Sequence, residues 1–293
     1  QTCALPIYSG SQPAPLRLHR APRVLPVREK GRRPAGCKQI MKALILAAGR
    51  GRRLWPFTAE RPKCLLDVGG ITLLERQLHH LRAAGLQRIV VVCGFGVDKI
   101  RSVVDALPFA DVKLLYNPFY AMSDNLISLW VARSEMSEDL ILLNGDNIFH
   151  PGSVQTLLQQ RTSCSLLAAR KSSYTDDDMK LYLNGEHVAH IGKSLACNRA
   201  DAESLGMLLF RNRGVGALRQ ALEQIVLNDS ALNSHFPAVI QHMIDAGHPF
   251  TCCFAQSFAC SDVDTPADLA RVRRELHRYC APAPAFAHAE GSA

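Results

Sequence analysis

From residue 41 onward, short apolar runs alternate with segments of helical spacing, and this alternation constrains the fold more than any other feature of the chain. Four apolar runs predict buried strands, at residues 43–48, 89–93, 112–116 and 140–143. Segments between them repeat apolar residues at intervals of three and four, which predicts helices. Strands joined by helical crossovers form parallel sheets with helices on both faces. We therefore predict an α/β fold with a doubly wound, mostly parallel sheet.

Beyond residue 164 the pattern changes to short strands separated by turns. Strands are predicted at 164–169, 181–183 and 188–191, and helices at 217–227, 239–246 and 266–278. We interpret the short strands as a small β-rich insertion within one domain that spans residues 41–279.

The first forty residues differ from the rest of the chain in charge and in pattern. They hold eight Lys or Arg and one Glu, whereas the other 253 residues hold 26 basic and 25 acidic side chains. Their apolar residues follow neither the strand period nor the helix period, so we predict a disordered leader at residues 1–40. Residues 1–7 resemble a reading frame of a sequencing adapter. We interpret the leader as non-native, with a transit peptide and a disordered anion-binding arm as alternatives, and we predict a disordered tail at 280–293.

Charge, hydrophobicity and cysteine usage exclude several classes of partner. Because the basic excess lies in the leader, the body is nearly neutral, and we expect no nucleic-acid binding. No apolar run reaches the roughly 18 residues of a membrane span, so we expect no membrane partner either. The chain has ten cysteines, without a C-x-x-C pair in the predicted domain, which favours buried thiols in a reducing, cytoplasmic compartment.

A glycine-rich loop follows the first predicted strand and begins at Gly49. Glycines let backbone N–H groups approach a phosphate without a Cβ in the way. The loop does not match a Rossmann fingerprint, because Leu54 stands at the third glycine position, and no G-K-[ST] follows as in a Walker loop. Residues 49–63 instead read G-x-G-x-R-L-x-P-x-T-x-x-x-P-K. This string resembles the signature of nucleotidyltransferases that couple a nucleoside triphosphate to a phosphorylated small molecule.

Four further segments are similar to one branch of that superfamily, the phosphocholine, 2-aminoethylphosphonate and inositol-1-phosphate cytidylyltransferases. They are residues 117–130, 179–180, 203–206 and 262–266, so the resemblance covers the whole predicted domain. It implies a fold like that of the nucleotide-diphospho-sugar transferases, in which the β-rich insertion binds the acceptor. It also implies a Mg²⁺-dependent enzyme that transfers CMP from CTP to a small phosphorylated or phosphonate amino-alcohol-type acceptor and releases pyrophosphate.

The chemistry of this transfer explains the residue types in the loop. An acceptor oxygen that is already ionised attacks the α-phosphorus, so the barrier lies in bringing two polyanions together rather than in removing a proton. Backbone amides of residues 49–53 and the Arg53 guanidinium can hold the phosphates that leave, and the resemblance places Lys63 against the α-phosphate. The expected nucleotide-binding residues are Leu46, Ala48, Gly49, Arg50, Gly51, Arg52, Arg53, Lys63 and Asn125.

Three aspartates are the candidate Mg²⁺ ligands. Asp146 follows the apolar run at 140–143, at the edge where open α/β sheets bind ligands, and packing gives little reason for a carboxylate there. Mg²⁺ prefers one or two carboxylates together with phosphate oxygens and water. Asp264 is the expected second carboxylate and Asp262 a further candidate. The alternative role for Asp264 is an N-terminal cap of the helix that begins near Pro266.

Charged residues of the central segments are expected to meet the acceptor. The resemblance implies that Lys180 faces a phosphate and that Lys180, Lys63 and Arg53 form the catalytic set. The expected acceptor-binding residues are Asp124, Asp178, Lys180 and Glu203. The run of aspartates at 176–178 has two interpretations: a solvated loop, or a group that recognises an amine on the acceptor.

Two departures from the branch bear on the acceptor. The branch commonly has paired asparagines where this chain has Asp124 and Asn125, and an aromatic residue where it has Cys260. A primary ammonium group favours carboxylates, whereas a trimethylammonium group favours aromatic faces. The departures therefore favour a primary-amine acceptor such as 2-aminoethylphosphonate.

Two other functions are open alternatives. A sugar-1-phosphate or polyol-phosphate nucleotidyltransferase that uses another NTP would share the loop and the metal ligands. A nucleotide-sensing subunit on an inactive fold predicts the loss of Lys63, Asp146 or Asp264, and all three are present. The expected partners are CTP, or another NTP, and the acceptor, and the sequence leaves open whether the chain forms a homodimer.

Overall fold

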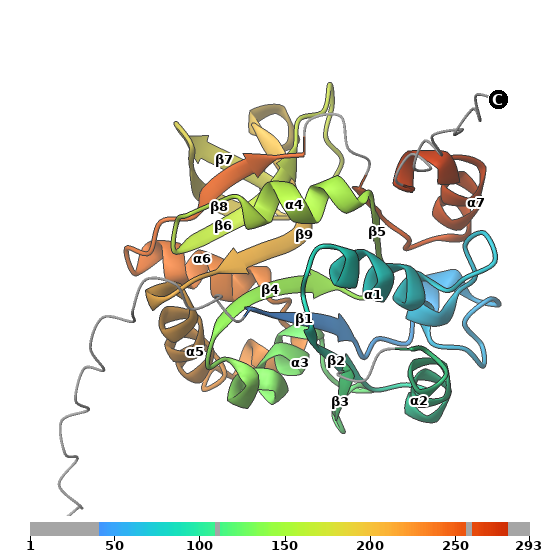
Figure 1. The fold of residues 1–293 in the computed structure, drawn as a ribbon. Coiled ribbons are helices and arrows are strands. Elements are labelled where there is room, and N and C mark those ends of the chain that lie inside the picture. Colours follow the sequence, from blue (N-terminus) through green and yellow to red (C-terminus); the bar gives the residue numbers. More distant parts are fainter. Residues whose placement is uncertain (1–40, 109–111, 256–259, 281–293) are drawn as a thin grey trace, which may run out of the picture. The chain divides into compact units, whose positions relative to one another are not determined.

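A nine-stranded sheet forms the centre of the fold (Figure 1). The computed structural model describes residues 41–108, 112–255 and 260–280, and these lie in a unit that spans Gln39–Ala293. The predicted leader at 1–40 and the predicted tail beyond residue 280 lie outside the described residues. No helix in the described ranges is both long enough and apolar enough to cross a membrane.

The strands confirm the predictions for the first half of the domain. They are β1 Met41–Ala47, β2 Arg88–Cys93, β3 Val112–Tyr116, β4 Asp139–Asn144, β5 Asn147–Phe149, β6 Cys164–Ala169, β7 Lys180–Asn184, β8 His187–Gly192, β9 Ala202–Phe210, β10 Thr251–Phe254 and β11 Cys260–Asp262. The helices are α1 Leu73–Ala83, α2 Val97–Asp105, α3 Asn125–Val131, α4 Pro151–Leu158, α5 Arg213–Ile225, α6 Pro237–Asp245 and α7 Pro266–Arg274.

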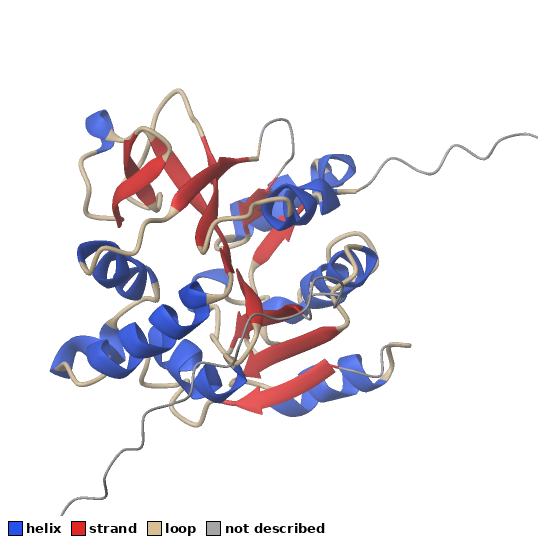
Figure 2. Ribbon diagram, turned by 60° about the vertical axis from the view of Figure 1, so that its left-hand side comes forward, coloured by secondary structure: helices blue, strands red, loops and turns tan. Residues whose placement is uncertain are grey.

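The side chains of β1 alternate between two hydrophobic cores. Leu44 and Leu46 belong to the core that α3, α5 and α6 cover, whereas Ala43 and Ile45 belong to the core that α1, α2 and α4 cover. Successive side chains of a strand point to opposite faces, so a continuous apolar run supplies both cores. Figure 2 shows helices on both sides of the sheet. The prediction of an α/β fold is therefore confirmed, with helices against both faces of the sheet.

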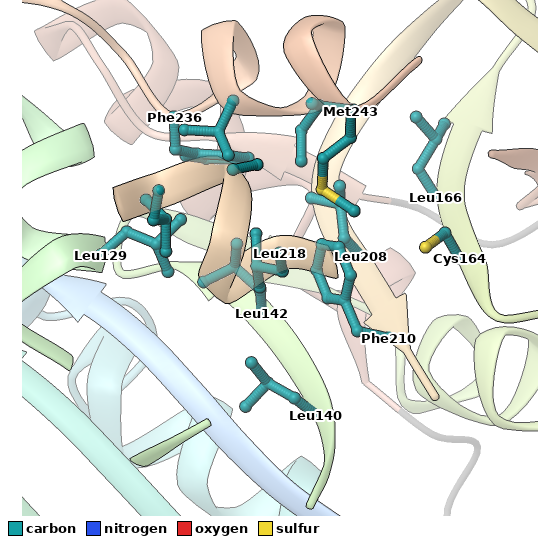
Figure 3. Packing of buried hydrophobic residues seen from close by; sticks show 14 of the residues in the cluster. Leu129, Leu140, Leu142, Cys164, Leu166, Leu208, Phe210, Leu218, Phe236 and Met243 are labelled. Carbon is teal, nitrogen blue, oxygen red and sulfur yellow. The ribbon is translucent and has the colours of Figure 1, made fainter. Parts of the chain in front are cut away.

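The core under α3, α5 and α6 joins the two halves of the sheet. Figure 3 shows Leu129 of α3, Leu218 of α5 and Met243 of α6 packed with residues of the strands below. These strand residues include Leu142 of β4 and Leu208 of β9, which pair directly in the sheet. One continuous core therefore connects the parallel strands with the strands that follow them.

The prediction of a mostly parallel sheet is wrong for the second half of the domain. The strand order is β3-β2-β1-β4-β9-β6-β10-β8-β7. The pairs among β1, β2, β3 and β4 are parallel, but β9 runs antiparallel to both β4 and β6. The β7–β8 hairpin pairs with β9 and β10, so the predicted β-rich insertion continues the main sheet. Apolar periodicity marks the strands but carries no information about direction, which the connections decide.

A third core anchors the C-terminal helix beside the first loop. Leu54 of the loop packs with Val263, Leu269 of α7 and Tyr279. Thr265 caps α7 through its side-chain oxygen, which accepts a hydrogen bond from Asp268 N at 3.2 Å. The alternative role of Asp264 as the helix cap is thus wrong, and its carboxylate is available to the cleft described next.

Candidate active site

The site forms where the carboxyl ends of β1 and β4 lie side by side. The chain leaves β1 toward β2 and β3 on one side and returns as β4 on the other, and open α/β sheets bind ligands at such a point. Gly145 N donates to Leu46 O at 2.9 Å, which joins the two strand ends. A Cβ on Gly145 would lie 2.7 Å from Ala47 Cβ, so only glycine allows this approach.

Gly51 folds the first loop back onto Lys63. Its φ of +67° lies in the left-handed region, and a Cβ there would lie 2.9 Å from Lys63 Cβ. Thr58 Oγ1 donates to Gly51 O at 2.7 Å and holds this turn. The motif residues Gly51, Thr58 and Lys63 therefore form one packed unit.

Lys63 is held between two carboxylates. Its Nζ donates to Asp146 Oδ2 at 2.6 Å and also pairs with Asp264 Oδ1, and the lysine side chain is 13% exposed. Burial alone would lower the pKa of Lys63, but the charges of Asp146 and Asp264 raise it above its ordinary value. The ammonium group is therefore charged at any physiological pH.

Hydrogen bonds from Gln77 and the pairing of β5 with β11 bring Asp146 and Asp264 together. Gln77 Nε2 of α1 donates to the carbonyls of Asn144 and Asn147 at 3.0 and 2.7 Å, which fixes the turn that carries Asp146. Strand β11 pairs antiparallel with β5, and Val263 N then donates to Asp146 O at 3.1 Å. The backbone thus places residue 264 next to residue 146, although they are far apart in sequence.

The two carboxylates fit a divalent cation that also binds phosphate. Asp146 Oδ1 is buried and has no hydrogen-bond partner among the described residues, and a buried acceptor of this kind normally has a ligand. No group of three His, Cys, Asp or Glu in the described ranges is arranged to enclose a metal ion. Two carboxylates with open positions for phosphate oxygens and water are the arrangement that Mg²⁺ prefers.

Asp262 differs from the other two predicted ligands. Its Oδ1 accepts a hydrogen bond from Asn147 Nδ2, and it does not complete a three-carboxylate group with Asp146 and Asp264. We retain Asp146 and Asp264 as the first proposed ligands, and the role of Asp262 as a further candidate stays a prediction.

A second cluster of charges lies beside the first. Arg53 Nη2 donates to Asp264 Oδ2 at 2.7 Å, and Arg53 Nη1 donates to Asp177 Oδ2 at 3.0 Å. Lys193 Nζ donates to the other oxygen of Asp177 at 2.9 Å. Hydrogen bonding and the charge of Lys193, followed by the charge of Arg53, lower the pKa of Asp177. Arg53 therefore connects the partly buried pair of carboxylates to an exposed acidic loop.

Two adjoining cavities meet at these clusters. A cavity of about 340 Å³ is lined by the loop residues Gly49, Gly51, Arg52 and Arg53 together with Lys63, and we call it the nucleotide cavity. A cavity of about 220 Å³ is lined by Arg53, Asp177, Lys193 and Glu203, and we call it the acceptor cavity. Asp146, Asp264, Asn125 and His235 line both. A ligand in one cavity can therefore reach a ligand in the other at the carboxylate pair.

The structure brings most of the predicted nucleotide-binding residues together. Leu46, Ala48 and the loop residues line the nucleotide cavity. Arg50 is the exception, because its guanidinium lies 5.1 Å from the centre of the Phe95 ring and outside the residues that line the cavity. Asn125 lines both cavities, and its Oδ1 accepts a hydrogen bond from Phe236 N at 2.8 Å.

Lys180 does not reach either cavity, which corrects the expectation of a catalytic role. The residue is fully buried, and its Nζ donates to the carbonyls of Thr175, Asp178 and Asp176 at 2.8, 3.3 and 3.4 Å. A cation that three carbonyls surround supports the loop above it. Its place at the start of β7 directs the side chain into the protein rather than into the cleft.

The predicted acceptor-binding carboxylates have different surroundings. Glu203 lines the acceptor cavity, but Lys171 Nζ pairs with its Oε2 at 2.5 Å. Burial raises the pKa of Glu203, and Lys171 opposes this shift. Asp178 also pairs with Lys171, at 3.0 Å, outside the acceptor cavity. Asp124 lines the nucleotide cavity rather than the acceptor cavity. Of the predicted set, Glu203 is thus the one at the acceptor end.

Sequence reasoning missed two residues of the cleft, Lys193 and His235, and it included Asp177 only as one member of the run of aspartates at 176–178. Lys193 follows the last residue of β8, where a strand end delivers its side chain to the sheet edge. That position was a usable signal, because ligands bind at strand ends. His235 had no signal of its own, since the α5–α6 connection reaches the cleft only through contacts such as Leu126 N to Ser234 O at 3.3 Å.

The loop, the carboxylate pair and the two cavities match what a nucleotidyl transfer needs. A family model described as the MobA-like NTP transferase domain matches residues 43–259. The chain belongs to this family. It contains an NTP transferase domain with a mixed α/β fold, and the resemblance stated from the sequence motifs is confirmed at this level.

Two curated relatives and one solved structure show what this NTP transferase is similar to. It is 33% identical to the CMP-5'-(3-aminopropyl)phosphonate synthase of Streptomyces rubellomurinus, over 44% of this chain and 21% of the relative. It is 32% identical to a bifunctional IPC transferase and DIPP synthase of Rubrobacter xylanophilus, over 80% of this chain and 51% of the relative. The chain thus spans about a fifth and about half of these relatives.

The fold is shared with a solved CTP transferase. The structure of the inositol-1-phosphate CTP transferase from T. maritima matches with a TM-score of 0.71 and 20% identity, over 82% of this chain and 97% of that chain. Because the match covers nearly all of that protein, the two chains share one overall fold.

Proposed function

We propose that this NTP transferase is a cytidylyltransferase that transfers CMP from CTP to a small acceptor carrying a phosphate or phosphonate and a primary amine. The observation that carries the proposal is the pair of cavities joined at Asp146 and Asp264, with Lys63 on the nucleotide side and Lys193 on the acceptor side. The name of the 33% identical relative, an aminopropylphosphonate synthase, supports the choice of nucleotide and acceptor.

Each group in the cleft has a role in this reaction. An oxygen of the acceptor forms a bond to the α-phosphorus of CTP, and the bond to pyrophosphate breaks. The backbone of the loop at 49–53, with Arg52, binds the phosphates that leave, and Arg53, which lines both cavities, meets the anionic end of the acceptor. Lys63 stabilises the negative charge that develops at the α-phosphate, and Lys193 binds the attacking anion. The acceptor oxygen is already ionised, so no residue has to act as a base.

Asp146 and Asp264 would hold Mg²⁺ together with phosphate oxygens. The ion would supply charge neutralisation at the reacting phosphates. In the structure described above, Lys63 pairs with the same two carboxylates. The lysine is therefore within reach of any group that these carboxylates bind.

The lining of the acceptor cavity favours a primary amine over a trimethylammonium group. Asp177 and Glu203 line it, and Phe236 is its aromatic residue among those described. Two further aromatic faces are already covered by cations, because Arg133 lies over the Trp130 ring and Arg199 over the Tyr182 ring. Carboxylates replace the water around a primary ammonium group well, whereas a trimethylammonium group has no N–H to donate.

The test is a matrix of four nucleoside triphosphates against an acceptor panel, with release of pyrophosphate as the readout. The panel contains 2-aminoethylphosphonate, 3-aminopropylphosphonate, phosphoethanolamine, phosphocholine, inositol 1-phosphate and glucose 1-phosphate. We expect the highest kcat/KM for CTP with an amino-phosphonate or phosphoethanolamine. The highest kcat/KM for phosphocholine would overturn the choice of amine. Activity confined to inositol or glucose 1-phosphate would favour a polyol- or sugar-phosphate nucleotidyltransferase instead.

A further inference from the structure

Asp177 occupies the position between the two cations of the acceptor cavity. One of its oxygens accepts from Arg53 and the other from Lys193, at 3.0 and 2.9 Å. Its side chain is 69% exposed in the opening of the cavity. Two oxygens that each bind a different cation are the arrangement expected of a bound phosphate or phosphonate. The carboxylate thus occupies the place that the proposed acceptor anion requires.

The loop beneath Asp177 is built to hold it there. Lys180 Nζ donates to three carbonyls of residues 175–178 from below. Asp178 Oδ2 accepts from Thr175 N at 2.8 Å, and Asp178 Oδ1 pairs with Lys171 at 3.0 Å. Lys180 and Asp178, which were both expected to meet the acceptor, therefore fix the loop that presents Asp177. Lys180 and Asp178 are positioning residues.

The charges around the acceptor cavity are predominantly acidic. Its described lining contains Asp146, Asp177, Glu203, Asp262 and Asp264, whereas its Lys and Arg side chains are Arg53 and Lys193. Glu203 is paired with Lys171 from behind, and Arg53 is shared with Asp264. An anion that forms ion pairs with Arg53 and Lys193 therefore displaces Asp177. The Asp177 carboxylate then has no cationic partner and lies next to a negatively charged ligand.

We propose that Asp177 is a specificity-determining residue that selects acceptors with a cationic group in addition to their phosphate or phosphonate. The inference rests on the proposed function and adds an exchange of partners to it. In the free protein Asp177 neutralises Arg53 and Lys193. When the acceptor binds, its anionic end takes these two cations, and its ammonium group becomes the new partner of Asp177.

The exchange discriminates between two kinds of ligand. A zwitterionic acceptor restores every ion pair that it breaks, because its anionic end pairs with Arg53 and Lys193 and its ammonium group pairs with Asp177. A plain anion of the same size breaks the pairs of Asp177 and offers nothing in return, so like-charge repulsion weakens its binding. Exposed ion pairs contribute little each, which limits the expected effect to about threefold to tenfold in affinity.

The experiment compares two ligands of equal size in direct binding by calorimetry. The ligands are 2-aminoethylphosphonate and n-propylphosphonate, which has a methyl group in place of the ammonium group. Both are titrated into the full chain with Mg²⁺ and the non-reactive α,β-methylene analogue of CTP. The variants are Asp177→Asn and the matched control Asp176→Asn, whose carboxylate accepts a hydrogen bond from Cys197 Sγ at 3.5 Å.

We expect the unmodified protein to prefer 2-aminoethylphosphonate. In Asp177→Asn, n-propylphosphonate binds about threefold to tenfold more tightly and 2-aminoethylphosphonate more weakly, so the preference collapses. Asp176→Asn keeps the preference. The proposal is overturned if Asp177→Asn leaves n-propylphosphonate binding unchanged or weaker, if both ligands shift together, if Asp176→Asn acts in the same way, or if neither ligand binds.

The proposed function is tested by a different assay, which measures turnover. Absence of turnover with every amine acceptor and every NTP would reject an amine-specific cytidylyltransferase. The tightening of n-propylphosphonate in Asp177→Asn would still show that Asp177 competes with anions for Arg53 and Lys193. The two failures are therefore distinguishable.

Discussion

The two charge clusters of the cleft both pair basic side chains with aspartates, but they differ in exposure to solvent. On the nucleotide side, Lys63 is 13% exposed and lies between Asp146 and Asp264, which are themselves largely covered. On the acceptor side, Arg53, Lys193 and Asp177 are between 41% and 69% exposed. Charges interact more strongly where water is excluded. The nucleotide side is therefore preformed and costly to disturb, whereas the pairs on the acceptor side can exchange partners.

The difference in exposure between the two clusters indicates which side of the cleft can change its specificity. The nucleotide side must stabilise the same developing charge whatever the acceptor is. The acceptor side must distinguish small molecules that share an anionic group, and weak exposed ion pairs can be replaced by those of a ligand. Variants on the two sides should accordingly differ in size of effect and in the kinetic parameter affected.

The largest effect is expected for Lys63→Ala. Removal of the buried ammonium group takes away charge stabilisation at the α-phosphate, and we expect kcat to fall by about a thousandfold, or about 4 kcal/mol. The KM for CTP should change far less. Steady-state kinetics with both substrates varied measures the two parameters separately, and thermal unfolding checks that the variant is folded. A variant that retains most of its kcat would remove Lys63 from the catalytic set.

The next effect is expected for Asp146→Asn, which tests the metal assignment. We expect a loss of turnover of about a hundredfold or more, because an amide is a weaker ligand for Mg²⁺. Without metal, the free energy of unfolding of this variant should lie within about 1 kcal/mol of that of the unmodified protein. A neutral amide is easier to bury than a carboxylate with an unpartnered Oδ1, but it also weakens the ion pair with Lys63.

Metal binding provides the second readout for Asp146. Added Mg²⁺ with CTP should raise the melting temperature of the unmodified protein by mass action and should leave that of Asp146→Asn nearly unchanged. Equal stabilisation of both proteins by Mg²⁺ would contradict ligation by this residue.

On the acceptor side, Lys193→Ala should have a smaller and more selective effect. Loss of one charged hydrogen-bond donor costs about 1.5–3 kcal/mol, which lowers kcat/KM for the acceptor by about tenfold to a hundredfold. The KM for CTP should hardly change. Equal losses for CTP and the acceptor would show that Lys193 serves the nucleotide side instead.

Lys180→Met is the matched comparison, because Lys180 was the lysine expected in this role. The methionine keeps the aliphatic part of the side chain but leaves three loop carbonyls without their donor. We expect a lower free energy of unfolding, by about 1–3 kcal/mol, and a reduced preference for amine acceptors. A variant with normal stability and a normal acceptor profile would contradict the positioning role.

The smallest effect concerns His80 of α1, which lies behind the nucleotide side. Burial lowers the pKa of His80 to about 4, below the unfolded value of about 6.5. The unfolded chain therefore binds more protons than the folded protein between these values, so stability is complete above pH 6.5 and falls as the pH drops toward 4.

Urea unfolding at several pH values measures this dependence. His80 is partly reached by solvent, so we expect it to account for about 1–2 kcal/mol of the loss. His80→Gln should flatten the dependence in this window, and His79→Gln, an exposed neighbour, should not. An unchanged slope in His80→Gln would show that the ring is more hydrated than its packing against Phe149 indicates.

The strands of the first half were predictable because local pattern and tertiary structure agree there. Each of β1, β2 and β4 is an apolar run that is almost wholly buried, the edge strand β3 is partly buried, and such runs can be read without knowing their neighbours. Strand β9 was missed, although it lies between β4 and β6 in the sheet. Its left-handed Gly206 interrupts the run. The direction of β9 depends on chain connections that no apolar period encodes.

The motif at 49–63 and the carboxylates Asp146 and Asp264 were predictable for a similar reason. Glycines, a stiffening proline and a carboxylate after a strand are local requirements of phosphate and metal chemistry. The choice between lysines was not predictable. Lys180 and Lys193 flank the same hairpin, and only the packing of β7 and β8 directs one ammonium group inward and the other to the cleft.

The sequence by itself therefore determined the α/β architecture of the first half, the phosphate-binding loop and the two principal carboxylates, because each depends on residues close together in the chain. The tertiary structure alone decided the mixed sheet, the pairing of β5 with β11 that brings Asp264 to Asp146, and the place of Asp177 between Arg53 and Lys193. The pairing of β5 with β11 and the contact between Arg53 and Asp177 join residues more than a hundred positions apart. All of these features depend on how the whole sheet packs rather than on any local pattern.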